Sequence, residues 1–354
     1  MNLHTRYFDF RFLLAFCFSL FLFACCDCDC EQGPIGPEGP EGKKGDMGNS
    51  PTFIVPDDEE DIQTAIDMLP ADGGSVFVRA GTYSLDEGIH IDRSNISLSG
   101  EMGTLLRLAA GVNQPVILIG SDEENPSVPI ENISVKVLEI DGNMSAQDSE
   151  IDPNRPWIRN NGIDVRAVTD LHISEMDIHH ARSGGVVVSW HSKIIYINKS
   201  SFHHNYFDGI ALYASEDIIV SDFFCNYNNA AGLSLDNDLK QVQFSNGTIR
   251  NNGDVGVFAR HSKDLKFQNL IISDNQSHGC FLSHTSLGTG TGVQSLIFSS
   301  CSFTRNMGYG FRLTSPKFES NKISIAGSVF SSNSLGSISL GPDSELYQIG
   351  NVFQ

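Results

Sequence analysis

The sequence predicts an all-β fold, a single-stranded parallel β-helix, and three observations support this prediction. A glycine followed by alternating apolar residues recurs through residues 160–341 at steps of 23 to 31 residues. An asparagine usually stands four residues before that glycine. Each repeat holds three short apolar runs and leaves no room for a helix. A repeat of this length made of three short strands is typical of one turn of a parallel β-helix.

The recurring residues set the frame of the coils. After each glycine the chain alternates with period two, as at Ile210 and Leu212, which predicts a strand with one buried face. Asparagines stacked at one turn are expected to form an amide ladder that satisfies buried backbone groups. The glycines are Gly162, Gly185, Gly209, Gly232, Gly256, Gly279, Gly310 and Gly336, and the asparagines are Asn205, Asn228, Asn252, Asn275 and Asn306.

The charge of the chain argues against some classes of function. The chain has 354 residues and a formal net charge of −20. Nucleic-acid binders need a basic face, so this charge argues against a nucleic-acid partner. The negative charge would also repel a polyanionic glycan. This second argument is weaker, since Ca²⁺ bridges or a local arginine cluster can hold such a glycan on an acidic wall. No cofactor is predicted, and Ca²⁺ is left open.

Residues 1–25 are predicted to be an export signal. Two arginines precede residues 12–24, a stretch with a single polar residue. That stretch is too short to span a membrane as a helix and fits the apolar region of a signal peptide. Its end resembles the bacterial lipobox, in which the cysteine, here Cys25, is acylated and anchors the exported protein in a membrane at the cell envelope or surface. Ordinary cleavage near Ala24, leaving Cys25 free, is the alternative.

Residues 26–50 are predicted to be a cysteine-rich start followed by a stalk. Cys26, Cys28 and Cys30 could form inter-chain disulfides, carry further acyl chains or bind a soft metal. Glycine occupies every third position six times in residues 33–50, which is the pattern of a collagen triple helix. Two alternatives stay open, a collagen-like stalk that joins a homotrimer and a flexible monomeric spacer.

Residues 51–354 are predicted to form the β-helix, with a helix over its N-terminal end. Asp57 is the expected N-cap, with Glu60 three residues later. Such a helix would cover an open strand edge that otherwise promotes aggregation. Its apolar face would consist of Ile62, Ala65, Ile66 and Leu69.

The opening of this region resembles the pectate-lyase-like proteins, also called pectin lyase-like. The resemblance implies a right-handed coil over roughly residues 53–340. That superfamily includes polysaccharide lyases, C5-epimerases, hydrolases, phage tailspikes and non-catalytic surface proteins, so the resemblance predicts a fold and leaves the reaction open. The matching phrases are IQTAID at 62–67, GGSVFV at 73–78, AGTY at 80–83, NISLSG at 95–100 and IDGN at 140–143.

The strand after each glycine carries the candidate catalytic residues. Side chains two and four residues after the glycine should face solvent, and equivalent positions in successive coils are about 4.8 Å apart. Arg260 could neutralise a uronate carboxylate, His261 or His284 could take the C5 proton, and Tyr213 could protonate the leaving oxygen. The predicted catalytic set is Tyr213, Asp236, Arg260, His261 and His284.

The predicted substrate-binding residues lie on the same face and on one loop. The loop between Asn143 and Asn160 interrupts the coils and carries Trp157, which is either a platform for a sugar ring or an anchor that packs the loop. The predicted binding set is Trp157, Asp164, Arg166, Trp190, His191 and Arg312.

Two enzyme classes need residues that these positions supply only in part. Alginate C5-epimerases of the resembling fold carry a Tyr-Gly-Phe-Asp-Pro-His phrase, whose aspartate matches Asp164, whereas Asn161 and Arg166 replace its tyrosine and histidine. Hydrolases need two carboxyl groups about 5–10 Å apart. Asp164 and Asp236 are three coils apart, roughly 14 Å, which disfavours hydrolysis.

The sequence therefore predicts an exported, lipid-anchored β-helix that binds a polysaccharide along its exposed strand face without catalysis. The alternative is a polysaccharide lyase or C5-epimerase acting on uronic-acid glycans.

Overall fold

The computed structural model describes residues 51–283 and 292–354. The predicted export signal with Cys25, the cysteine-rich and collagen-like segment and His284 lie outside the described residues. Among the residues that the structure describes, no helix is both long and apolar enough to cross a membrane.

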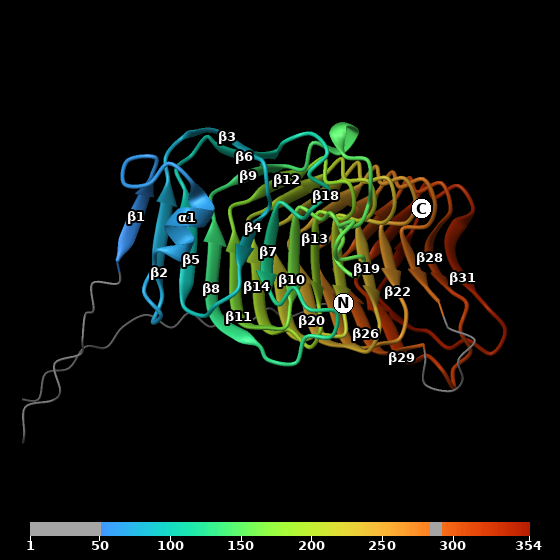
Figure 1. Cartoon of the computed structure of the whole chain (residues 1–354). Coiled ribbons are helices and arrows are strands. Elements are labelled where there is room, and N and C mark those ends of the chain that lie inside the picture. The colour runs from blue at the N-terminus through green and yellow to red at the C-terminus, as the bar shows by residue number, and fades with distance from the viewer. Residues whose placement is uncertain (1–50, 284–291) are drawn as a thin grey trace, which may run out of the picture. The chain divides into compact units, whose positions relative to one another are not determined.

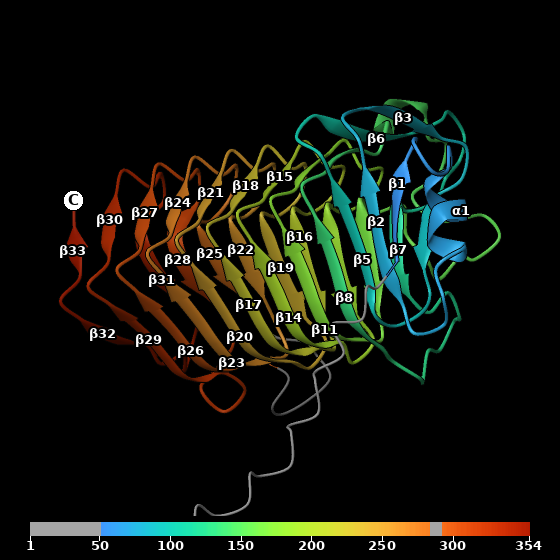
Figure 2. The ribbon, with the colours of Figure 1, turned by 90° about the vertical axis from the view of Figure 1, so that its left-hand side faces the viewer.

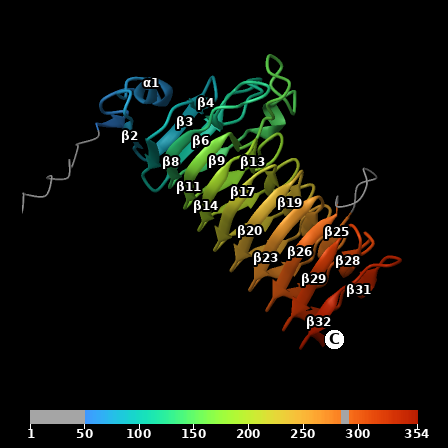
Figure 3. The ribbon, with the colours of Figure 1, turned by 90° about the horizontal axis from the view of Figure 1, so that it is seen from below.

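The predicted parallel β-helix is confirmed. Within the described ranges the strands form three parallel sheets, here named sheets I, II and III, and each coil adds one strand to each sheet in turn (Figures 1 and 2). Sheet II contains the strands that follow the recurring glycines. Figure 3 shows the strands of sheet I following one another coil by coil.

Sheet I has twelve strands. They are β1 (Thr52–Val55), β2 (Gly74–Val78), β5 (Ile96–Gly100), β8 (Ile130–Lys136), β11 (Val168–Ser174), β14 (Lys193–Asn198), β17 (Glu216–Ser221), β20 (Leu239–Ser245), β23 (Ser262–Gln268), β26 (Val293–Ser299), β29 (Asn321–Ala326) and β32 (Tyr347–Ile349).

Sheet II has ten strands. They are β4 (Ile89–Ile91), β7 (Ile117–Gly120), β10 (Ile163–Arg166), β13 (Val186–Ser189), β16 (Ile210–Tyr213), β19 (Leu233–Asp236), β22 (Val257–Ala259), β25 (Cys280–Leu282), β28 (Tyr309–Leu313) and β31 (Gly336–Leu340).

Sheet III has eleven strands. They are β3 (Gly81–Leu85), β6 (Thr104–Leu108), β9 (Glu139–Asp141), β12 (Asp177–His179), β15 (Ser201–His203), β18 (Phe224–Asn226), β21 (Thr248–Arg250), β24 (Ile271–Ser273), β27 (Ser302–Thr304), β30 (Val329–Ser331) and β33 (Val352–Phe353).

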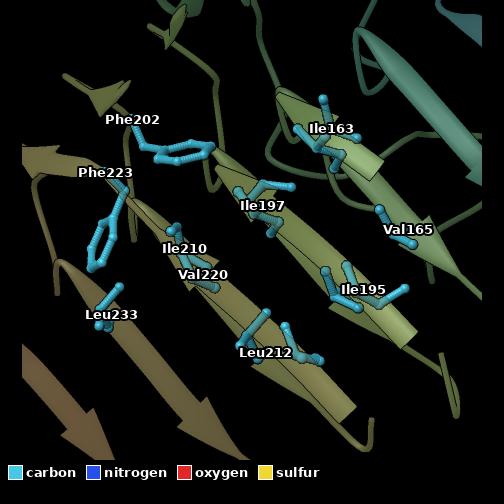
Figure 4. Close-up of a cluster of buried hydrophobic side chains, with 14 of the residues drawn as sticks. Ile163, Val165, Ile195, Ile197, Phe202, Ile210, Leu212, Val220, Phe223 and Leu233 are labelled. Atoms are coloured by element: carbon cyan, nitrogen blue, oxygen red, sulfur yellow. The ribbon is translucent and has the colours of Figure 1, made fainter. Parts of the chain in front are cut away.

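The core is a set of stacked side chains inside the coil. Alternate residues of each strand point inward, so equivalent apolar residues of successive coils lie on one another (Figure 4). The rings of Phe244 and Phe267 stack with centroids 5.2 Å apart, and those of Phe267 and Phe298 stack at 4.4 Å. This continuous apolar interior holds the outward side chains of each sheet in register.

The predicted asparagine ladder is present between sheets III and II. The side-chain amide of Asn228 donates to the carbonyl oxygen of the Asn252 side chain at 3.1 Å, and that of Asn252 donates to Asn275 at 3.0 Å. The close packing around the ladder also explains why glycine recurs after each asparagine, since no Cβ would fit there. A Cβ on Gly232 would lie 2.9 Å from the Asn252 amide nitrogen and 2.8 Å from the Gly256 carbonyl oxygen.

The predicted helix exists, but its cap was predicted wrongly. Helix α1 (Ile62–Asp67) packs against β1, β2 and β4 at the N-terminal end of the coils. The side chain of Asp61 caps it and accepts a hydrogen bond from the Thr64 amide at 2.7 Å. Asp57 cannot serve, because its carboxylate is paired with Arg79 at 2.8 Å, several residues before the helix begins.

Candidate functional site

A groove of about 360 Å³ lies on the outer face of sheet II, beside the loop that joins β9 to β10. We call it the sheet II groove. Its lining spans the coils from β10 to the turn after β19. It includes six residues predicted from the sequence to act on or bind a substrate, namely Trp157, Asp164, Arg166, Trp190, His191 and Tyr213.

The loop is fixed over sheet II by two side chains. The indole of Trp157 donates a hydrogen bond to the carbonyl oxygen of Asp122 at 2.8 Å. The guanidinium of Arg155 bridges Asp152 at 2.8 Å and Asp122 at 3.0 Å. The two alternatives for Trp157 are therefore compatible, because its nitrogen anchors the loop while 37% of the residue stays exposed in the groove.

Arg166 holds the groove wall together. Although its position was expected to face solvent, only 2% of it is exposed, because the loops on either side cover it. Its guanidinium donates to the backbone carbonyls of Ser121 at 3.0 Å and Glu123 at 2.6 Å. It also lies 5.4 Å from the ring of Trp190. Arg166 thus positions Trp190 and the loop, and little of its charge is open to a ligand.

Asp164 is a buried carboxyl group in the floor of the groove. Only 3% of the residue is exposed. Burial raises the pKa of Asp164 to about 6, although the nearby Arg166 opposes the shift. A carboxyl with this pKa exchanges a proton near neutral pH, as catalytic acids and bases do.

Tyr213 and the nearby Asp208 are two further side chains with shifted pKa values. The Tyr213 hydroxyl lies 3.1 Å from the Ser234 hydroxyl. Burial, with the neighbouring Asp208 carboxylate, raises the pKa of Tyr213 to about 12. Burial also raises the pKa of Asp208 to about 6, against a hydrogen bond from the Ala231 amide at 2.9 Å. Asp208 was missed because the predicted columns began after the glycine, whereas it directly precedes Gly209.

Of the other predicted catalytic residues, the three that the structure describes, Asp236, Arg260 and His261, lie outside the lining of the groove. Asp236 is 5% exposed and accepts a hydrogen bond from the Arg260 guanidinium at 2.8 Å. The two side chains therefore neutralise each other across adjacent coils. His261 lies just after β22, beyond the coils that line the groove.

Arg312 lies farther along sheet II, on β28. Its guanidinium is 3.0 Å from a ring nitrogen of His278 and 5.6 Å from the ring centre of Phe281. The structure thus does not bring Arg312 to the other predicted binding residues.

A larger groove, of about 700 Å³, lies on the outer face of sheet I. Exposed apolar residues such as Ile219 and Ile297 line it, and its two carboxylates, Asp217 and Asp264, are exposed. Because it holds no buried carboxyl group, the sheet II groove is the better candidate for chemistry and for selective polar binding.

Similarity to a known protein family identifies the class of fold. A family model described as a right handed beta helix region matches residues 190–353. The protein is thus a right-handed parallel β-helix. No curated protein matches its sequence.

Solved structures with the same fold differ in what they do. The surface protein and adhesin PfbA of Streptococcus pneumoniae matches with a TM-score of 0.64 and 14% identity, over 84% of this chain and 94% of that one. The A-module of the mannuronan C-5 epimerase AlgE6 of Azotobacter vinelandii gives 0.53 and 16%, over 82% and 93%. Pectate lyase Pel9A gives 0.52 and 14%, over 80% and 72%. At these identities the similarity shows the fold alone.

Proposed function

We propose that the protein is exported, anchored by a lipid on Cys25, and binds a polysaccharide in the sheet II groove without catalysis. The observation that carries the binding proposal is the pair of tryptophans, Trp157 and Trp190, beside polar side chains in one groove. Flat rings with a few fixed polar groups are how proteins usually hold a ligand of mixed polarity. The groove crosses four coils, roughly 14 Å at the strand spacing, which is longer than one sugar ring.

The cation predicted to neutralise a uronate in a lyase, Arg260, is engaged, which disfavours elimination through that residue. A lyase needs a free cation for the uronate carboxylate. Arg166 is engaged by backbone carbonyls and Arg260 by Asp236. Arg159 lines the groove and has one long ion pair, 3.9 Å to Glu150. It is the cation best placed to meet an acidic sugar.

A lyase or C5-epimerase is the second candidate, and one observation favours it. Asp164, with its pKa near 6, and Tyr213 line the same groove. A carboxyl group with this pKa is mostly ionised at neutral pH and could take a proton that Tyr213 then replaces on the opposite face.

The binding experiment is a calorimetric titration of the protein with a panel of uronic-acid and neutral polysaccharides, with and without Ca²⁺. Trp190→Ala should weaken binding about tenfold, because aromatic anchors dominate such sites. Tyr196→Ala is the matched control, since Tyr196 is an aromatic residue lining the sheet I groove and should leave affinity unchanged. Equal binding by wild type and Trp190→Ala would refute the groove as the site.

The same panel separates the two candidates. β-Elimination leaves an unsaturated uronate that absorbs in the ultraviolet, and epimerisation changes the proton NMR spectrum of the polymer. Binding without either signal supports the non-catalytic proposal. Either signal, abolished by Asp164→Asn, would establish the enzyme instead.

A fractionation experiment tests the anchor. Cys25→Ser should move the protein from the membrane fraction to the soluble fraction, because one acylation site is lost. Retention of the variant in the membrane would contradict lipid anchoring through Cys25.

A further inference from the structure

Four histidines gather on sheet III, away from the lining of both grooves. Asp141, His179 and His203 occupy equivalent positions of β9, β12 and β15 in register. His180 and His204 follow at the turn, each with a left-handed backbone (φ 49° and 55°). Two successive coils thus present the same His-His pair on the surface.

Within each pair the two imidazoles point at each other through the same atoms. The Nδ1 atoms of His179 and His180 are 2.7 Å apart, and those of His203 and His204 are 2.8 Å apart. The nitrogens of two imidazoles bound to one tetrahedral Zn²⁺ lie about 3.3 Å apart, given Zn–N bonds of about 2.0–2.1 Å. A small rotation of either ring would therefore admit the ion between the two nitrogens.

Carboxylates hold the outer nitrogen of one ring in each pair. The Nε2 atom of His179 lies 3.2 Å from the Glu139 carboxylate, and that of His203 lies 2.9 Å from Asp177. A carboxylate there keeps the proton on Nε2, so Nδ1 carries the lone pair, which a metal can take in place of the contact with the neighbouring Nδ1. This carboxylate–histidine arrangement is the usual second shell of a metal-binding histidine.

The coil before the first pair supplies a third ligand to that pair. A carboxylate oxygen of Asp141 and one nitrogen each of His179 and His180 lie within 4.8 Å of one another. Asp141 is the strand neighbour of His179, and His179 is in turn the strand neighbour of His203. The second pair therefore has an imidazole where the first pair has a carboxylate.

We propose that Asp141, His179 and His180 form a binding site for a divalent transition metal, with Zn²⁺ as the reference ion and Glu139 as the residue that orients His179. Imidazole donors select Zn²⁺, Cu²⁺ or Ni²⁺ over Ca²⁺ and Mg²⁺, which prefer oxygen ligands. The side chains of His179 and Asp141 keep 12% and 14% of their surface exposed, and a tetrahedral ion would take its fourth ligand from water or from a group of a partner. His203 and His204 are a weaker neighbouring pair.

The competing explanation is a surface stack of rings with no ligand. His180, His204 and Tyr227 do stack, at 5.5 Å and 5.1 Å. The chain offers a matched control in His172, which stacks on Tyr196 at 4.7 Å and pairs with Asp170 at 3.3 Å. His172 has the same ring stack and carboxylate partner but no second imidazole.

The test is a calorimetric titration with ZnCl₂ of the full chain, purified without a polyhistidine tag. We expect one tight equivalent in the wild type, at least about a hundredfold weaker binding in His180→Ala, and about 10- to 100-fold weaker binding in Glu139→Gln. His172→Ala should bind as the wild type does. Circular dichroism of each metal-free variant checks that the coil is intact.

Three results would overturn the proposal. The first is a wild type that binds no Zn²⁺. The second is His180→Ala binding with wild-type affinity, which would place the metal elsewhere, for instance on Cys26, Cys28 and Cys30. The third is a larger loss in His203→Ala than in His180→Ala, which would move the site to the second coil. With Co²⁺ in place of Zn²⁺, the absence of a thiolate charge-transfer band supports histidine and carboxylate ligands.

Discussion

The asparagine ladder and the sheet II groove are built from the same coils in opposite ways. In the ladder every coil contributes the same side chain, and each buried amide of the interior rungs bonds to the next rung and to a backbone carbonyl. In the groove each coil contributes a different residue, and the buried carboxyl of Asp164 has a raised pKa. Repetition thus stabilises the fold, whereas departures from repetition create the candidate site.

The largest expected effect is in the ladder. Asn252→Ala removes the side-chain hydrogen bonds to the Cys225 carbonyl and to Asn275. It also leaves the buried Asn228 backbone N–H without its acceptor, while the Asn228 side-chain amide keeps only its bond to the Phe202 carbonyl. Unpaired buried polar groups are costly, so we expect a loss of about 2–4 kcal/mol in the free energy of unfolding. Urea denaturation measures this loss.

The control is Asn229→Ala, an exposed position next to the rung Asn228 and without a left-handed backbone, which should cost less than about 1 kcal/mol. Equal costs would mean that the ladder is not a source of stability.

An intermediate effect is expected at Asp164 and depends on pH. Its pKa is about 6 in the fold, against an ordinary value of 3.8. The folded state therefore binds more protons between these two values, and stability falls as pH rises through this window. Asp164→Asn should remove about 3 kcal/mol of that fall, since each pKa unit is worth about 1.4 kcal/mol. Denaturation of both proteins at pH 4 and pH 7 measures the difference. Parallel pH profiles would show that Asp164 titrates normally.

The smallest effect is expected at the edge of the groove. Ser234→Ala removes the hydrogen bond to the Tyr213 hydroxyl, but water in the groove can replace it. We expect a cost of about 1 kcal/mol or less, measured by the same urea titration. A cost as large as that of Asn252→Ala would show that the groove, like the ladder, is a closed structural network.

The comparison also explains what could be predicted from the sequence. The glycine and asparagine positions predicted the coils and the ladder because a repeated signal reports a repeated environment. The ladder's last rung, Asn333, was missed because the residue four before Gly336 is Ser332, so a slightly different step hid it. Asp61 was passed over for Asp57, because adjacent acidic residues look alike without the ion pair to Arg79.

The candidate site was predictable only in part. Tyr213 and Trp190 were found because they stand in columns after the glycine, but burial of Arg166 and Asp164 depends on a loop whose path carries no periodic signal. The sequence also contained a repeated motif that could have predicted the histidine cluster. The same dipeptide occurs at 179–180 and 203–204, about one coil apart, and Asp177 stands two residues before the first pair.

Each coil contacts chiefly the coils before and after it, since neighbours in every sheet come from successive coils. A gene duplication that adds one whole coil would therefore leave every other strand pairing and ladder bond as it is. The protein could lengthen or shorten its outer faces in steps of about 4.8 Å over evolutionary time, with selection acting afterwards on the few outward side chains of the new coil.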